Sequence, residues 1–106
     1  MADNVGLRMA FSAYIKLLFE DCESTDTRLA GLQFSGKQLF FVSNGMAFCK
    51  FWDEWKLLWQ ITHGSTSPSR HRVNEPMRNL EGFSAAFNCT NGSRMTRSKT
   101  EMCSLW

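Results

Sequence analysis

Apolar residues near the start of the chain recur at the spacing of one helix face. The members of this face are Leu7, Ala10, Phe11, Tyr14, Leu17 and Leu18. Their i, i+3, i+4, i+7 repeat predicts an amphipathic helix over residues 3–20. Residues 20–26 are polar and predict a loop after this helix.

A capping box marks the start of a second helix. Ser35-Gly36-Lys37-Gln38 places a serine at the N-cap and, three residues later, a glutamine that can reach back to the cap. The helix is expected over residues 36–50. Its apolar face includes Leu39, Phe40, Val42, Met46, Ala47 and Phe48. The pair Asn44-Gly45 in its middle is unfavourable for a helix interior.

The next residues predict two shorter helices with a loop between them. Asp53 can cap a third helix, whose apolar stripe contains Trp55 and Trp59 and is expected in the core together with Leu58 and Thr62. Residues 63–76 are rich in Gly, Ser, Thr, Pro and Arg and predict a loop. Asn79 is expected to cap a short fourth helix that buries Leu80, Phe83, Ala86 and Phe87.

The fold class is therefore mainly α, with about four helices and an irregular tail. The tail is polar from Thr90 until Leu105-Trp106, and no internal repeat or β-hairpin signal interrupts the helical pattern. At 106 residues, the chain is at most one domain.

The charge and hydrophobicity of the chain argue against two classes of binding partner, nucleic acids and membranes. The net charge is only +2 and Arg and Lys form no long run, which argues against nucleic acid or an anionic membrane as a partner. No apolar run approaches the roughly 20 residues of a membrane span. Met1-Ala2-Asp3-Asn4 does not begin a signal peptide. Taken literally, these features predict a cytosolic protein.

The cysteines point to another compartment. Cys22, Cys49, Cys89 and Cys103 form no C-x-x-C pair, which argues against a zinc site built from them. The sequons Asn88-Cys89-Thr90 and Asn91-Gly92-Ser93 make Asn88 and Asn91 candidate glycosylation sites. Spaced cysteines beside sequons are typical of an oxidising compartment. A segment missing before Met1 would reconcile the two signals.

The polar residues alone identify no reaction. The sequence lacks H-E-x-x-H, a glycine-rich phosphate loop and G-x-S-x-G. Asp3 is interpreted as a helix N-cap, and His63 and His71 as solvated loop residues. Arg70 and Arg72 are interpreted as a basic loop that touches water or an acidic neighbour. These interpretations support a soluble helical domain and no more.

Five ordered motifs nevertheless resemble a known family. They are Ala2-Asp3-Asn4-x-Gly6-Leu7-x-x-Ala10-Phe11-x-Ala13-Tyr14, Leu29-Ala30-Gly31-Leu32 followed by Gln38-Leu39-Phe40-Phe41, Ser67-Pro68-Ser69-Arg70-x-Arg72-Val73-Asn74, Asn79-x-x-x-Phe83-Ser84-x-Ala86-Phe87-x-Cys89, and Cys103-x-x-Trp106. The series resembles the C-terminal end of the neprilysin and endothelin-converting enzyme family of zinc metallopeptidases. It spans nearly all 106 residues. The resemblance implies that residues 1–106 are the C-terminal portion of a zincin-type catalytic domain whose zinc-binding helix is absent.

The resemblance implies roles for three residues. Asp3 matches the family aspartate that accepts a hydrogen bond from a zinc-bound histidine and thereby orients it. Arg72 matches the arginine that donates to the carbonyl of a substrate peptide. Thr66 stands where the family has a histidine that stabilises the oxyanion, although a local shift would bring His63 there instead. His71 replaces the usual Phe, and Arg70 is interpreted as a neighbour of the site.

The resemblance also implies what the chain lacks. The zinc ligands of the family and its general base are absent, so zinc is expected in a full-length parent and not in this chain alone. Cys49, Cys89 and Cys103 match family half-cystines whose partners lie earlier, and Cys22 has no family match. An extracellular or cell-surface location and peptide substrates follow from the resemblance.

Two hypotheses therefore compete. In the first, the chain is a fragment of a zinc metalloendopeptidase and is inactive alone. In the second, it is a degenerate, non-catalytic relative that serves as a binding or scaffold module, which Thr66, His71 and the Asn44-Gly45 interruption favour. An unrelated small helical protein is a third reading that the ordered motifs disfavour.

Overall fold

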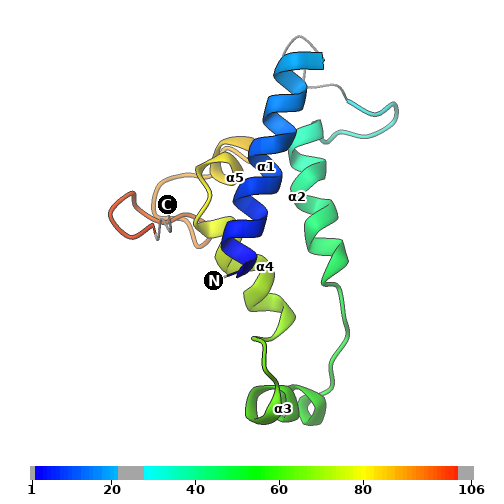
Figure 1. The fold of residues 1–106 in the computed structure, drawn as a ribbon, viewed down its shortest axis with the longest axis vertical. Helices are drawn as coiled ribbons and strands as arrows, with labels where there is room; N and C mark the ends of the chain where they lie inside the picture. The colour runs from blue at the N-terminus through cyan, green and yellow to red at the C-terminus, as the bar shows by residue number, and fades with distance from the viewer. Residues whose placement is uncertain (1, 22–27, 103–106) are drawn as a thin grey trace.

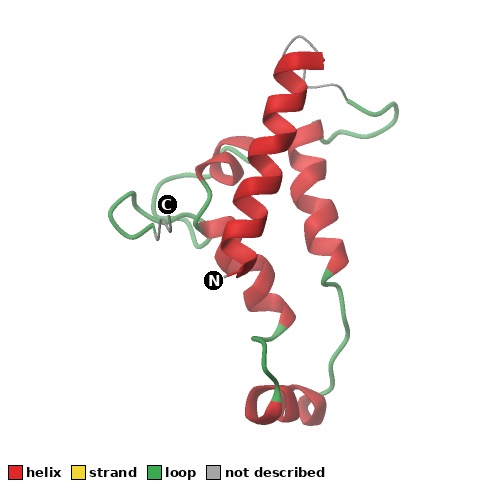
Figure 2. Cartoon of the chain, viewed as in Figure 1, coloured by secondary structure: helices red, strands yellow, loops and turns green. Residues whose placement is uncertain are grey.

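The computed structural model describes residues 2–21 and 28–102, and every regular element within them is a helix (Figure 2). The helices are α1 (Ala2–Asp21), α2 (Gly36–Ala47), α3 (Glu54–His63), α4 (Ser69–Arg78) and α5 (Glu81–Ala86). An irregular tail follows α5 through residue 102. The predicted mainly-α class with an irregular tail is confirmed. Cys22, Cys103, Leu105 and Trp106 lie outside the described residues.

The helices α2 and α3 begin where their capping residues predict. The Ser35 hydroxyl accepts a hydrogen bond from the Gln38 backbone at 3.2 Å, and the Gln38 side chain accepts one from the Ser35 backbone at 2.9 Å. Asp53 caps α3 by accepting from the Lys56 backbone at 2.8 Å. Local side-chain-to-backbone bonds decide these helix starts, which is why sequence alone locates them.

The predicted loop over residues 63–76 is wrong from Ser69 onward, because α4 occupies Ser69–Arg78. Pro76 and Met77 are buried and Val73 packs against the core, so a tertiary contact at i, i+3, i+4 spacing stabilises a helix of mostly polar composition. Asn79 is not an N-cap. It ends α4, and Leu80 precedes α5 without a side-chain cap bond.

Aromatic rings from three helices lie at the centre of the core, which Leu7 of α1 and Met77 of α4 complete. Phe41 of α2 is 1% exposed and contacts Phe11 of α1 and Phe83 of α5, with ring centroids 4.9 and 5.2 Å apart. The predicted face of α2 missed Phe41 and included Met46, which is 70% exposed. Apolar residues surround α2 on more than one side, so periodicity alone did not select the inward face.

The third helix lies apart from this core, at the lower end of Figure 1. It has no buried residue, and Trp55 and Trp59 are 77% and 56% exposed. The expectation that the tryptophan stripe is core is therefore wrong for the described residues. The stripe has the composition of a buried face, but no described element packs over it.

Candidate functional site

The most prominent polar contact in the candidate region joins two helices that are distant in sequence. Arg72 on α4 donates from Nε to Asp3 Oδ2 at 2.9 Å and from Nη2 to Asp3 Oδ1 at 2.8 Å, across 69 residues of chain. This parallel two-bond geometry is the strongest form of carboxylate recognition by arginine. The expectation that Arg72 touches an acidic neighbour is confirmed, although Arg72 lies on a helix rather than in a loop.

Asp3 lies in the first turn of α1 and its carboxylate is directed to Arg72, so the interpretation of Asp3 as an N-cap is wrong. The hydrogen bond from Arg72 lowers the pKa of Asp3 below its ordinary range, and partial burial opposes this shift. The same hydrogen bond raises the pKa of Arg72. Both directions describe one ion pair that stays charged at neutral pH.

A second contact fixes the plane of the Arg72 guanidinium. Its central carbon lies 4.8 Å from the centre of the Phe48 ring, which is the geometry of a cation–π contact. The bonds to Asp3 use Nε and Nη2, which leaves the remaining N–H groups of the fork for another acceptor. Asp3 likewise keeps lone pairs for a further donor.

Arg72 also lines a pocket of about 510 Å³ between the end of α2, α3 and the start of α4. Its walls are residues 47–48, 50–52 and 66–70, completed by Leu57, Gln60 and Arg72. Three of these wall residues are aromatic, namely Phe48, Phe51 and Trp52, and the Trp52 indole nitrogen is buried without a hydrogen-bond partner among the described residues. The pocket therefore combines ring surfaces with polar donors.

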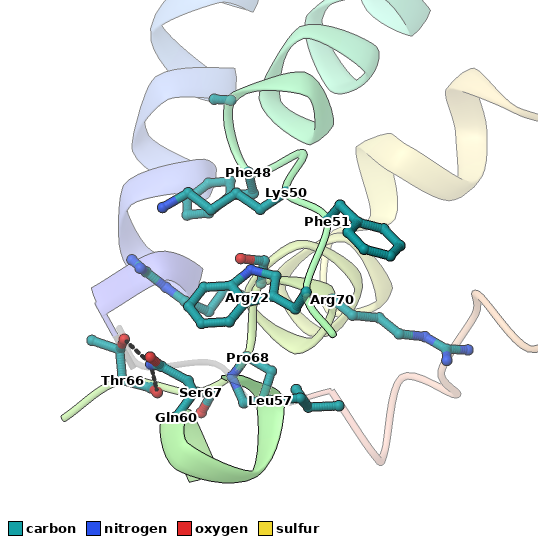
Figure 3. A pocket seen from close by; sticks show the side chains of 13 residues that line it. Phe48, Lys50, Phe51, Leu57, Gln60, Thr66, Ser67, Pro68, Arg70 and Arg72 are labelled. Carbon is teal, nitrogen blue, oxygen red and sulfur yellow. Dashed lines mark hydrogen bonds between the residues drawn. The ribbon is translucent and has the colours of Figure 1, made fainter. Parts of the chain in front are cut away.

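Thr66 stands on the rim of this pocket. The Gln60 amide donates to the Thr66 carbonyl at 2.9 Å and to its hydroxyl at 3.3 Å, as the dashed lines in Figure 3 show. The structure thus places Thr66 and Arg72 on the same pocket. Arg70 also lines it, but its guanidinium points away from the other labelled side chains (Figure 3).

The two histidines are not in this pocket. His63 ends α3, where its ring stacks on Trp59 at 5.5 Å and its Nδ1 lies 2.6 Å from the Thr62 hydroxyl. His71 is exposed on α4. Both are solvated as expected, but both lie on helices and not in a loop.

The remaining candidate residues lie elsewhere on the described surface. Cys49 is exposed, Cys89 is partly buried, and both are free thiols. The sequon asparagines Asn88 and Asn91 are exposed, and Asn88 has a positive φ of 50°. No helix in the described segments is both long and apolar enough to cross a membrane.

Sequence reasoning did not identify Phe48, Trp52 or Gln60 as parts of the pocket. The predicted apolar face of the second helix includes Phe48, whereas Phe48 follows the last residue of α2 and supports the Arg72 guanidinium. Gln60 near the end of α3 binds Thr66 six residues later. No sequence pattern predicts a hydrogen bond at this spacing. No sequence signal for Trp52 existed beyond its being aromatic.

Comparisons with known proteins find similarity along the whole chain. Residues 1–103 match Peptidase family M13. The chain is 36% identical over 106 residues to Membrane metallo-endopeptidase-like 1 of Mus musculus and 35% identical over 106 residues to an Endothelin-converting enzyme homolog of Locusta migratoria. Neprilysin-3 of Drosophila melanogaster is also 35% identical over 106 residues. These alignments cover 100% of this chain and only 13–14% of each relative. No solved structure matches significantly.

Proposed function

The chain belongs to Peptidase family M13, the neprilysin family, and from this premise we propose that residues 1–106 form the C-terminal part of the catalytic domain of a peptide-hydrolysing metalloendopeptidase. The observation that carries the proposal is the two-bond pair between Asp3 and Arg72. Both residues match family motifs, and the fold brings them together across 69 residues of chain, with Arg72 lining the pocket.

Arg72 is proposed to hold the substrate. Its guanidinium is fixed by Asp3 on one edge and by Phe48 on one face, so little conformational entropy remains to be lost when a peptide carbonyl binds its free N–H groups. Asp3 is proposed to orient a histidine of the longer protein by accepting a second hydrogen bond.

Thr66 is proposed to occupy the position of the oxyanion-stabilising donor. The threonine side chain is shorter than a histidine and its hydroxyl is uncharged, and the Gln60 amide already donates a hydrogen bond to that hydroxyl. Loss of one oxyanion donor typically raises the barrier by about 2.7–4 kcal/mol, so a site with Thr66 should be slow.

The chain's own residues do not fit a zinc site. No group of three His, Cys, Asp or Glu side chains in residues 2–21 and 28–102 is arranged to hold a metal ion, and the sequence has no H-E-x-x-H. In the family the zinc polarises the scissile carbonyl. We assign no step of that chemistry to this chain. The zinc ligands and the general base are proposed to be residues of the longer parent protein.

A hybrid protein tests the proposal. This chain replaces the aligned residues of the mouse Membrane metallo-endopeptidase-like 1, and cleavage of a fluorogenic peptide is measured with zinc present. We expect slow cleavage that rises about 100-fold or more with Thr66→His. Ser65→His, one residue earlier in the same loop, is the control and should bring no gain. Arg72→Ala should lower kcat/KM in the Thr66→His hybrid.

Two results would contradict the proposal. One is a folded, zinc-loaded Thr66→His hybrid that cleaves no faster than the Ser65→His control. The other is zinc-dependent peptide cleavage by the purified 106-residue chain alone, since the proposal leaves it without metal ligands.

The alternative function is a non-catalytic binding or scaffold module. The bond between Gln60 and Thr66 favours it, because the residue at the donor position is tied to α3 instead of being free. In that case the chain should bind peptides by calorimetry in an Arg72-dependent manner, while the Thr66→His hybrid stays inactive.

The relatives also support a proposal on location. We propose an extracellular or cell-surface protein in which Cys49, Cys89 and Cys103 pair with cysteines of the parent and Asn88 and Asn91 accept glycans. The exposed Asn88 and Asn91 and the free thiols of Cys49 and Cys89 are compatible with those modifications.

A further inference from the structure

A chain of polar contacts links the irregular tail to the two helices that carry Asp3 and Arg72. Arg97, in the tail, donates from Nη1 to Asn79 Oδ1 at 3.0 Å and pairs through Nη2 with Glu75 of α4. The Asn79 amide donates in turn to Asn4 Oδ1 on α1 at 2.8 Å. The tail is thereby connected to the first turn of α1 through a single residue, Asn79.

Asn79 is the central member of this chain. It is 8% exposed, and both polar atoms of its side chain are used, one by Arg97 and one by Asn4. These two bonds decide which way the amide faces, because the guanidinium can only donate. A buried amide with both partners in place holds its neighbours in one geometry, whereas loss of one partner leaves a buried polar atom unsatisfied.

The first turn of α1 depends on such outside contacts. The first turn of a helix has unsatisfied N–H groups and frays more readily than its interior. Asp3 and Asn4 are consecutive residues of this turn, and they bind Arg72 and Asn79 respectively. Arg72 and Asn79 lie two turns apart along α4, so two separate points fix the turn against one helix.

We propose that Asn79 and Arg97 are positioning residues that hold the first turn of α1, and with it Asp3, in register with Arg72. Neither residue touches the pocket, and each acts through Asn4. An effect of Asn79 and Arg97 on catalysis rests on the proposed function, whereas their hydrogen bonds are independent of it.

The Arg72 Nε–H group reports directly on the pair, because it donates to Asp3. Its proton–nitrogen NMR signal and its solvent-exchange rate are measured in the full chain and in two variants. Arg97→Ala removes the tail contact, and Asn79→Asp keeps an acceptor for Arg97 but cannot donate to Asn4. Both variants should shift the signal and speed exchange about fivefold, the factor that the net worth of one hydrogen bond implies.

Two controls separate positioning from general destabilisation. Lys99 lies in the same tail as Arg97, and Lys99→Ala removes its exposed ion pair with Glu81 of α5. Ser35→Ala weakens the cap of α2 and removes no contact of Asn79 or Arg97. Both controls should leave the Nε–H signal and its exchange unchanged. Unaltered exchange in Arg97→Ala and Asn79→Asp would overturn the inference, as would an equal increase in the Ser35→Ala control.

The hybrid enzyme keeps this inference separate from the proposed function. In the Thr66→His hybrid, Arg97→Ala should lower kcat/KM about fivefold while Lys99→Ala does not. If no hybrid cleaves peptide, the proposed function fails, and the Nε–H measurement still decides whether Arg97 positions Asp3.

Discussion

Truncation of Phe41 to alanine removes a ring that contacts aromatic side chains of α1, α2 and the α5 region. Phe41 is 1% exposed and lies within 6.3 Å, centroid to centroid, of Phe11, Phe40, Phe83 and Phe87. A buried Phe→Ala change costs about 3–5 kcal/mol from lost burial and the cavity left behind. Because these neighbours come from three helices, the cavity cannot close by moving one side chain, and we expect the upper half of that range. Small domains have only about 5–15 kcal/mol of stability, so this loss is large.

Urea unfolding followed by far-ultraviolet circular dichroism measures the change in the free energy of unfolding. Phe51→Ala is the matched control, because the same side chain is 96% exposed there and its loss should change the free energy by no more than about 0.5 kcal/mol. If the two variants differ by less than about 1 kcal/mol, the aromatic cluster is not the main source of stability and the reasoning is refuted.

Three further predictions concern the ion pair, a close helix contact and a cap. The pKa of Asp3 is lowered from its ordinary value of 3.8, so its contribution to the free energy of unfolding is complete above that value and is lost as pH falls through the lowered pKa. Urea midpoints of the wild type and Asp3→Asn should therefore differ constantly near neutrality and converge in acid, and a gap that widens in acid would contradict this. An added Cβ on Gly82 would overlap the Phe11 ring, so Gly82→Ala should cost about 1–3 kcal/mol in thermal unfolding. Gly45→Ala, whose Cβ has ordinary space, should not destabilise, and equal effects would argue against the overlap. Ser35→Ala should cost about 1 kcal/mol by urea unfolding and reduce helix content, and no change would show that the cap bond is dispensable.

The helices that sequence predicted well are those with local signals. The starts of α2 and α3 depend on the side chains of Ser35 and Asp53, which bond to residues three positions away. The helix α4 has no side-chain cap, and its stability comes from the burial of Pro76 and Met77 against other elements. Such burial depends on the whole fold, so composition alone predicted a loop.

The candidate site shows the same division. Family motifs assigned roles to Asp3 and Arg72 separately, but nothing in the spacing of two residues 69 positions apart predicts that they bind each other. The role of Asn79 could not be predicted either, because its partners are also distant in sequence. As the residue before a helix it has the identity of a cap, and its amide is used instead for contacts with Asn4 and Arg97 that no local pattern encodes.

The isolated position of α3 has a consequence for the affinity of the pocket. Leu57 and Gln60 form one wall, yet they belong to a helix without a buried residue, joined to its neighbours by residues 48–53 and 64–68. A ligand that bridges this wall and Arg72 restricts a helix that no buried side chain holds in place, and the conformational entropy lost in doing so lowers its affinity. A surface that covered Trp55 and Trp59 would remove that cost in advance and tighten binding at a distance, without touching the ligand.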